Sequence, residues 1–359
     1  MSRATPKVLV GDETGLLKLV SFNREDGTGK IEASYGTQGR EKGVERLCAF
    51  EENSVVIGTK SGAVRLWNGV AIEDSIDKVG GGRICGMNLL NADRLITCGS
   101  EGIIETRSWP EGNITGEFSV NTKVDFGRLS AEDARIAIGG KNVDLKIWDI
   151  ETSQEMFKAK NVPNDSLDIP VPIWPTDVAW SSSQSVLACT AFNQIRAYDL
   201  RQRRPVKDIS LQLKGDDQNR HLNCIVVKPG TNDAIVGDIF GKVSIVDVFR
   251  KSKLIASFKG PKASVRSLDV QTESNTLACG GLDRYVRIFD LTSHKQLGRC
   301  YVKQKLTAVT MAGLPMPKSI EDGGSNDDEL DWGDEDDDEE DAVVPEKPDA
   351  NDRKRSRRA

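Results

Sequence analysis

The sequence predicts an all-β chain of seven similar repeats, and three observations lead to this fold class. One signature recurs: an apolar run of strand length, a turn, and a second run in which apolar and polar residues alternate. Its turn positions lie 47, 40, 41, 51, 47 and 43 residues apart. Helical periodicity over about ten residues is almost absent before residue 312. A period in the low to mid forties with room for four strands is typical of a propeller blade, so residues 1–312 are predicted to form a seven-bladed β-propeller.

The strands of each repeat follow from the same local pattern. In the second repeat, Val64 and Leu66 alternate with polar residues after a Thr-Lys-Ser-Gly turn, which favours a tight hairpin. In the last repeat, residues 264–271 precede the signature and residues 294–302 follow it, which supplies the other two strands. The turn positions of the seven repeats are Gly11, Gly58, Cys98, Gly139, Thr190, Gly237 and Gly280.

The two ends of this region indicate how the ring closes. Residues 7–20 supply two strands with nothing upstream to pair with them, and residues 295–311 supply two strands with no signature after them. We expect these halves to join in one blade, because closure hides the sheet edges that an open array would expose.

The ends of the third strands resemble those of the WD-repeat family. The matching residues are Trp67, Trp148-Asp149, Tyr198-Asp199 and Phe289-Asp290. The Gly-His dipeptide of that family is missing, with Gly260-Pro261 in its place in the cleanest repeat, and its turn aspartate is clear only at Asp283. The resemblance implies a diverged WD40-type propeller, in which apolar packing replaces most of the family's His–Asp network.

Composition fits one large domain without secretion or membrane insertion. With 38% hydrophobic residues in 359, the chain can bury a large core, and neither a signal sequence nor an apolar run of membrane-spanning length is expected. The seven cysteines are an odd number without C-x-x-C spacing. Cys98, Cys189 and Cys279 occupy equivalent strand positions, so we expect buried thiols in a reducing compartment.

Residues 313–359 are predicted to be a disordered tail, acidic and then basic. Asp and Glu make up 14 of the 21 residues from Glu321 to Asp341. Residues 321–359 hold 17 acidic and 6 basic residues, which leaves the propeller with 43 basic and 38 acidic residues and a net charge of +5. Trp332 is either a short docking motif or incidental. The basic end is either a solubilising terminus or a nuclear-import signal made of Arg353, Lys354, Arg355, Arg357 and Arg358.

The sequence offers no catalytic constellation, so we predict that the chain is not an enzyme and needs no cofactor or metal. Its only histidines, His221 and His294, fall in separate repeats, and no nucleophile motif lies near them. Gly139-Gly140-Lys141 looks like part of a phosphate loop but falls in a hairpin turn and begins no helix.

A proline-rich insertion at residues 158–177 predicts a binding rim. In a WD propeller, the loops that lead into the inner strands share a face with the turns between the second and third strands, which here include Lys141-Asn142. The predicted binding rim consists of Lys141, Asn142, Lys158, Lys160, Asn161, Asn164 and Asp165. Alternatively, the insertion only covers the blade junction, with Leu167, Ile169 and Ile173 tucked in. Arg201, Arg203 and Arg204 are expected on the opposite face, as a second basic patch or a plain solvated turn.

Residues 139–180 resemble one family of WD proteins more specifically. The stretch K-x-K-N-V-x-N-D-x-L-D-x-x-V-P-I-W is similar to nucleolar factors that assemble the large ribosomal subunit, and residues 201–206, 277–291 and 303–309 fit the same family. The resemblance implies a monomeric, non-enzymatic scaffold in the nucleus and nucleolus. Such factors bind ribosomal RNA and assembly factors of the pre-60S particle during rRNA processing, and an AAA-type ATPase of the nuclear valosin-containing class releases them.

Two other classes of function stay open. Tyr198-Asp199-Leu200-Arg201 resembles the docking motif of substrate receptors of cullin-4 ubiquitin ligases. An acidic tail on a propeller would also suit a histone-binding protein. The proteins that co-purify from a nuclear extract separate these classes: pre-60S proteins and RNA, the damage-binding adaptor, or histones.

Overall fold

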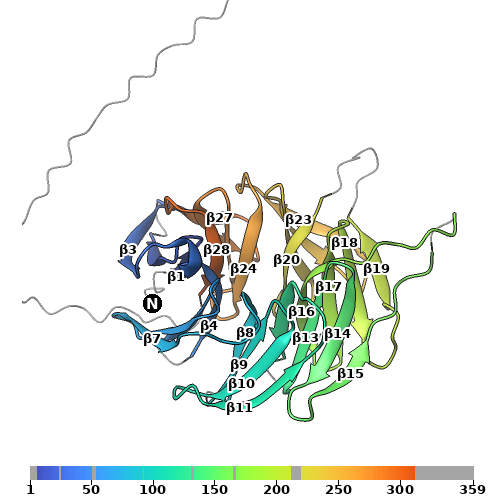
Figure 1. The fold of residues 1–359 in the computed structure, drawn as a ribbon. Coiled ribbons are helices and arrows are strands. Elements are labelled where there is room, and N and C mark those ends of the chain that lie inside the picture. The colour runs from blue at the N-terminus through green and yellow to red at the C-terminus, as the bar shows by residue number, and fades with distance from the viewer. Residues whose placement is uncertain are drawn as a thin grey trace, which may run out of the picture. The chain divides into compact units, whose positions relative to one another are not determined.

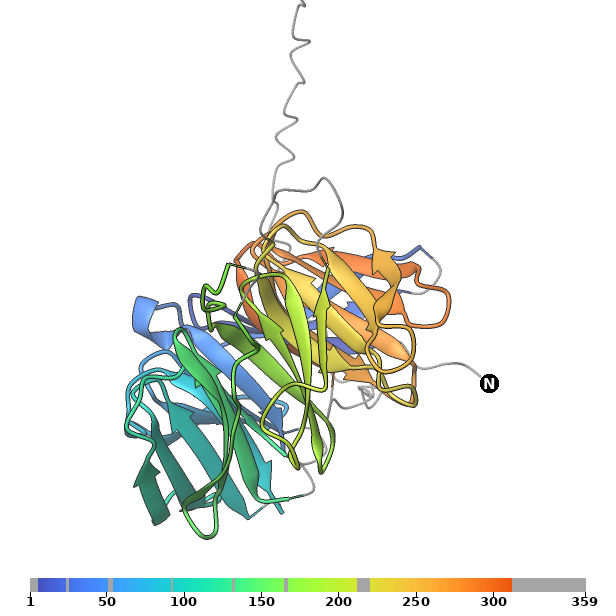
Figure 2. The same cartoon turned by 90° about the vertical axis from the view of Figure 1, so that its right-hand side faces the viewer.

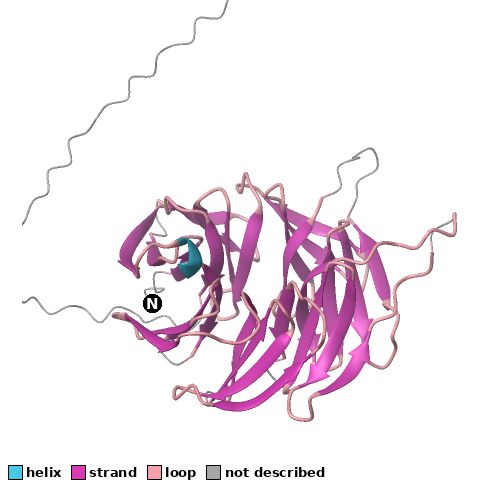
Figure 3. Ribbon diagram, in the orientation of Figure 1, coloured by secondary structure: helices cyan, strands magenta, loops and turns pink. Residues whose placement is uncertain are grey.

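The computed structural model describes residues 6–23, 26–50, 54–91, 93–130, 133–164, 167–211 and 220–311. Over these residues the chain forms seven four-stranded antiparallel sheets arranged as the blades of a ring (Figure 1). The helical element in this part of the chain is a single 3-10 turn, η1 (Arg40–Lys42), and all else is strand or loop (Figure 3). The prediction of an all-β, seven-bladed propeller is confirmed. The predicted tail, residues 313–359, lies outside the described residues.

Six blades are continuous in sequence, each running from an inner strand to an outer one. Their strands are β4 (Val44–Ala49), β5 (Val55–Thr59), β6 (Val64–Trp67) and β7 (Ile72–Ile76); β8 (Ile84–Leu90), β9 (Arg94–Gly99), β10 (Ile103–Ser108) and β11 (Ile114–Ser119); β12 (Phe126–Leu129), β13 (Arg135–Gly140), β14 (Val143–Asp149) and β15 (Gln154–Lys158); β16 (Pro175–Ser182), β17 (Ser185–Thr190), β18 (Gln194–Asp199) and β19 (Lys207–Ser210); β20 (Leu222–Val227), β21 (Ala234–Asp238), β22 (Val243–Asp247) and β23 (Lys253–Phe258); and β24 (Val265–Gln271), β25 (Thr276–Gly281), β26 (Tyr285–Asp290) and β27 (Gln296–Tyr301).

The closing blade combines three strands from the start of the chain with one from its end. Its order is β28-β1-β2-β3, with β1 (Lys7–Asp12), β2 (Leu17–Phe22), β3 (Gly29–Tyr35) and β28 (Leu306–Thr310). In the register of β1 and β28, Leu9 pairs with Thr310. The expected division into two strands from residues 7–20 and two from 295–311 is therefore wrong, because β27 pairs with β26 in the preceding blade. The outer strand β3 was missed since its residues alternate between half-buried and exposed, which leaves little apolar signal.

Apolar clusters between neighbouring blades hold the ring together. One such cluster joins Ile235 and Val243 of one blade to Leu277 and Phe289 of the next. Trp67 is fully buried and packs against Tyr35 of the closing blade, with ring centroids 5.4 Å apart. The predicted core role of Cys98, Cys189 and Cys279 is confirmed: all three are free and buried, and burial raises the pKa of Cys279 to about 12.

Candidate functional site: the top face of the propeller

Two kinds of loop meet on one face of the ring, which we call the top face. Each inner strand begins at this face and each second strand ends there, because neighbouring strands in a blade are antiparallel. The loops into the inner strands and the turns between second and third strands therefore share it. The blades β12–β15, β16–β19 and β20–β23 follow one another around the ring (Figure 2), so their loops on this face are neighbours.

The insertion lies between β15 and β16, and internal hydrogen bonds shape it. The side-chain amide of Asn161 donates to the Val171 carbonyl at 2.6 Å, and its oxygen accepts the Val162 amide at 2.9 Å. The amide of Asn164 donates to the Asp168 carboxylate at 2.8 Å. The two asparagines thus build the loop with their side chains rather than offering them to a ligand. Asp165 lies outside the described residues.

Lys141 and Asn142 meet the far end of this insertion, as the loop geometry predicts. The backbone amide of Asn142 donates to the Ile173 carbonyl at 3.0 Å, and Asn142 takes a left-handed φ of 60°, which asparagine tolerates well. The Lys141 ammonium lies 4.9 Å from the centroid of the Trp174 ring, a cation–π contact. The hairpin turn and the insertion therefore form one continuous surface.

Lys158 and Lys160 are exposed on the stem of the insertion and contact the next blade. The Arg203 side chain donates through Nε to the Lys158 carbonyl at 2.9 Å, and the Lys160 amide donates to the Arg203 carbonyl at 2.7 Å. The expected separation of the arginines from the rim is therefore wrong for Arg203. The Arg203 turn, which joins β18 to β19, therefore lies against the stem of the insertion. Exposed Arg201 and Arg204 flank Arg203 in the same turn.

The insertion does not bury its apolar residues at the blade junction as the alternative interpretation requires. The side chain of Leu167 is 76% exposed and that of Ile169 is 54% exposed, while Ile173 is half-buried. Exposed apolar side chains flanked by prolines suit contact with another molecule better than a purely covering role.

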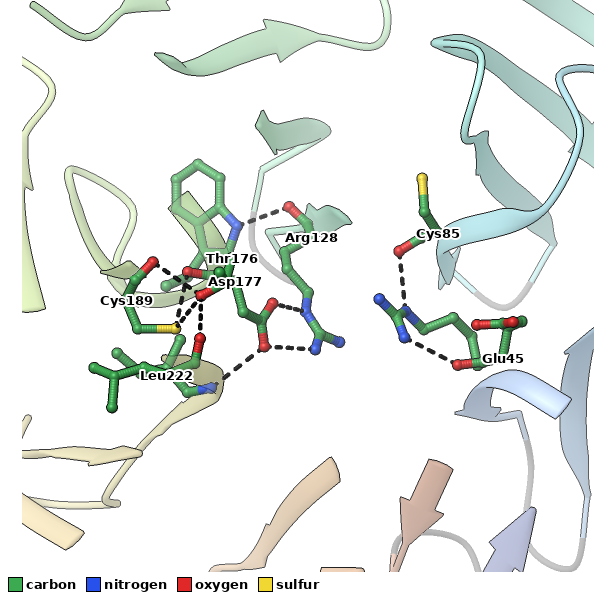
Figure 4. Close-up of polar contacts among 10 residues, drawn as sticks. Glu45, Cys85, Arg128, Thr176, Asp177, Cys189 and Leu222 are labelled. Carbon is green, nitrogen blue, oxygen red and sulfur yellow. Dashed lines mark hydrogen bonds and ion pairs between the residues drawn. The ribbon is translucent and has the colours of Figure 1, made fainter. Parts of the chain in front are cut away.

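The central channel carries polar contacts that sequence reasoning missed. Arg128 of β12 forms a two-pronged ion pair with Asp177 of β16, at 2.7 and 2.9 Å (Figure 4). Asp177 also accepts the Ile225 amide of β20 at 3.3 Å. Three successive inner strands are thus tied together across the blades. The available signal was weak: each residue sits near the start of an inner strand, but the pairing joins residues 49 positions apart.

A second guanidinium, that of Arg46, faces the same channel. It donates to the carbonyls of Cys85, at 3.0 Å, and Glu45, at 2.9 Å (Figure 4). Burial and the nearby Arg128 charge lower the pKa of Arg46. The part of the channel that opens to the top face encloses about 450 Å³, and Trp174, His221 and Arg266 stand at its mouth.

The histidines and the possible adaptor motif have structural roles in this fold. The His221 ring packs edge-on against Trp174 at 5.0 Å between centroids, and His294 packs against Phe258 at 5.8 Å. Tyr198 is buried, and Asp199 accepts the Arg201 amide at 3.0 Å, so turn geometry accounts for these two residues of the docking motif. Within the described ranges, no three His, Cys, Asp or Glu side chains group to hold a metal ion. A search of the same residues finds no helix able to span a membrane.

Comparison with known proteins agrees with this architecture and narrows the family. A family model for the WD domain, G-beta repeat, matches residues 252–290. WD repeat-containing protein 74 of Homo sapiens is 33% identical over 325 residues, covering 85% of this chain and 81% of the relative. The chain belongs to this WD-repeat family. Its members also include the Mus musculus protein of the same name, 34% identical over 327 residues with 85% and 81% coverage.

More distant matches extend the family and the fold. Ribosome biogenesis protein nsa1 of Schizosaccharomyces pombe is 28% identical over 357 residues, covering 84% of this chain and 87% of the relative. The computationally designed Ika8 protein superposes with a TM-score of 0.59 at 19% identity, covering 86% of this chain and 88% of that one. The latter likeness concerns the fold alone.

Proposed function

We propose that this protein is a non-enzymatic ribosome biogenesis factor that acts in the nucleus and nucleolus. Support comes from the Schizosaccharomyces pombe relative, which carries ribosome biogenesis in its name and matches 84% of the chain, and from a second relative so named that matches 51% of it. A propeller ring with exposed loops, whose described residues hold no metal-ligating cluster, suits a scaffold. The bound particle would be the pre-60S precursor, engaged during rRNA processing and left when an AAA-type ATPase of the nuclear valosin-containing class extracts the protein.

The observation that carries the binding proposal is the convergence of the insertion with Lys141 on the top face. Lys141, Lys158 and Lys160 are exposed there, and Arg203 joins them through its bonds to the stem. Exposed lysines and arginines position a protein on RNA phosphates without reading sequence. Leu167 and Ile169 add apolar area for a neighbouring assembly factor. Asn161 and Asn164 contribute indirectly, by holding the shape of the loop.

The test of the function is affinity purification of the full-length protein from a nuclear extract, followed by mass spectrometry and RNA sequencing. We expect large-subunit precursors and their assembly factors, including the ATPase. Recovery of the cullin-4 adaptor or of histones in their place would contradict the proposal.

Localisation provides a separate test, because the import signal lies in the tail. Deleting Arg353–Ala359 should move a fluorescent fusion from the nucleolus to the cytoplasm, since this cluster is the strongest import-type signal in the sequence. A fusion of the deleted protein that still reaches the nucleolus would assign import to the propeller or to a partner.

A further inference from the structure

Five side chains on the top face form two adjoining clusters of cationic and aromatic groups, Lys141–Trp174–His221 and Arg220–Phe240. Lys141 lies 4.9 Å from the Trp174 ring centroid, and that ring lies 5.0 Å from the His221 ring. Arg220 adjoins His221 in sequence, and its guanidinium carbon lies 5.8 Å from the Phe240 ring centroid. We call Lys141, Trp174, His221, Arg220 and Phe240 the cationic–aromatic strip.

Three successive blades hold the strip in place through their backbones. The turn that carries Phe240 bonds to the loop before β20 by the Ile239 amide, which donates to the His221 carbonyl at 3.0 Å. The loop before β16 is fixed in the same way, since the Ala191 amide donates to the Trp174 carbonyl at 3.0 Å. The strip is therefore organised before any ligand arrives, which lowers the entropic cost of binding.

The strip keeps the Phe240 ring and the Lys141 charge accessible, whereas Arg220 is half-buried and forms an ion pair with Asp238. Phe240 is 48% exposed, although a large apolar side chain gains free energy by burial. Two carboxylates lie nearby. Asp238 is buried, accepts the amides of its own turn and lies 3.5 Å from Arg220. Asp125 accepts the Lys141 amide at 2.9 Å. Arg266 stands beside His221 at the channel mouth and adds a further positive charge.

We propose that the cationic–aromatic strip is a binding site for single-stranded RNA. Unpaired bases would stack on the open face of Phe240 and on the His221–Trp174 pair, while Arg220, Lys141 and Arg266 contact the phosphates between them. This combination of cationic and aromatic groups is the chemistry by which proteins hold single strands without reading sequence, because every base has an aromatic face. A duplex hides its bases in the stack and cannot use the rings.

The proposal rests on the proposed function only in its choice of RNA as the ligand. The RNA site is the cationic–aromatic strip, whereas the proposed contact with the pre-ribosome also involves Lys158, Lys160 and the insertion. Lys141 belongs to both, so the experiment leaves it unchanged.

The experiment measures binding of the full-length protein to a fluorescein-labelled, unpaired RNA of about ten nucleotides, by anisotropy at two salt concentrations. The variants are Phe240→Ala and His221→Gln, and the control is Tyr301→Ala, which removes an equally exposed aromatic ring from β27. A Lys158→Glu/Lys160→Glu variant separates this site from the rim. Melting curves check that each variant is folded.

We expect Phe240→Ala to weaken binding about tenfold, as is usual for the loss of one stacked base. His221→Gln should weaken it less, and Tyr301→Ala should bind as the wild type does. The Lys158→Glu/Lys160→Glu variant should lose less than about threefold on this short RNA. The duplex of the same sequence should bind more weakly than the single strand.

Several results would overturn the proposal. One is wild-type protein that binds no single-stranded RNA, or that binds the duplex equally well. Another is a folded Phe240→Ala variant with unchanged affinity. If Phe240→Ala lowers association with the pre-60S particle while wild-type protein ignores RNA, the strip is a protein-docking site. Strip variants that bind the oligonucleotide as the wild type does would contradict the RNA site but not the proposed role in ribosome biogenesis. The failure of one proposal can therefore be told apart from the failure of the other.

Discussion

The last repeat and the insertion-bearing region use charged side chains in opposite ways. In the last repeat, Arg287 bonds to Asp283 at 2.6 Å and lies over the Tyr285 ring at 4.9 Å, and both charged groups are nearly buried. In the insertion region, Lys141, Lys158 and Lys160 are exposed and form no close salt bridge with a carboxylate among the described residues, although the Asp144 carboxylate lies within electrostatic reach of Lys158. The charged side chains of the last repeat bond to each other within its own hairpin, whereas those of the insertion region point to solvent.

The Arg128–Asp177 ion pair in the channel, like the Arg287–Asp283 pair of the last repeat, joins two charged side chains within the fold. Breaking it should have the largest effect on stability. Asp177→Ala leaves Arg128 without its carboxylate and removes the acceptor of the Ile225 amide. We expect a loss of about 3 kcal/mol in the free energy of unfolding, at the low end for buried pairs because the Arg128 side chain is 38% exposed to the channel. Urea denaturation measures it. The double variant Arg128→Met/Asp177→Leu should lose less than Asp177→Ala alone; a larger loss would show that the pairing is not the cause.

The turn of the last repeat should show the same kind of effect at a smaller size. Asp283 accepts the Tyr285 and Lys262 amides, both at 3.2 Å, in addition to its bond with Arg287. Asp283→Ala is expected to cost about 2 kcal/mol by denaturation. The matched control is Asp199→Ala, whose carboxylate accepts the amide of an exposed turn. If the two variants cost the same, the last repeat is not held by its buried charges.

Sequence patterns predicted the repeated parts of the fold because each blade repeats the same local chemistry. Val64 and Leu66 alternate in the chain and lie on the predicted strand β6. The patterns failed where position depends on contacts between distant segments. Arg203 contacts the stem of the insertion, which belongs to the neighbouring blade, and Arg128 pairs with Asp177 across a blade boundary. The cationic–aromatic strip likewise brings together residues of three blades. Its Trp174 ends the family-specific stretch of the insertion, but nothing in that pattern places it beside His221, and Phe240 belongs to no recognisable motif.

Acidification tests how the surroundings of His221 on the top face affect the stability of the fold. Burial, followed by the Arg266 charge, lowers the pKa of His221, while Asp125 opposes the shift. The unfolded chain therefore binds this proton more readily than the native one, so His221 stabilises the fold above pH 6.5 and this contribution is lost as the pH falls toward the lowered pKa. Melting temperatures of wild type and His221→Gln, taken from pH 7.5 to 5.5, should converge on acidification. Melting temperatures of the two proteins that stay equally far apart from pH 7.5 to 5.5 would contradict the assignment.

Association with the pre-ribosome tests most directly the claim that the insertion-bearing region carries the function. The variant Lys141→Glu/Lys158→Glu/Lys160→Glu reverses three exposed charges of the rim, and the control Lys251→Glu/Lys253→Glu/Lys295→Glu reverses three exposed charges in and beside turns of the bottom face. Each exposed substitution should cost less than about 0.5 kcal/mol. In gradient sedimentation of nuclear extracts at low salt, we predict that the rim variant leaves the pre-60S fractions and that the control stays, with the difference between them narrowing as salt weakens the phosphate contacts of the intact rim. A rim variant that remains with the particle while the control is lost would contradict the account.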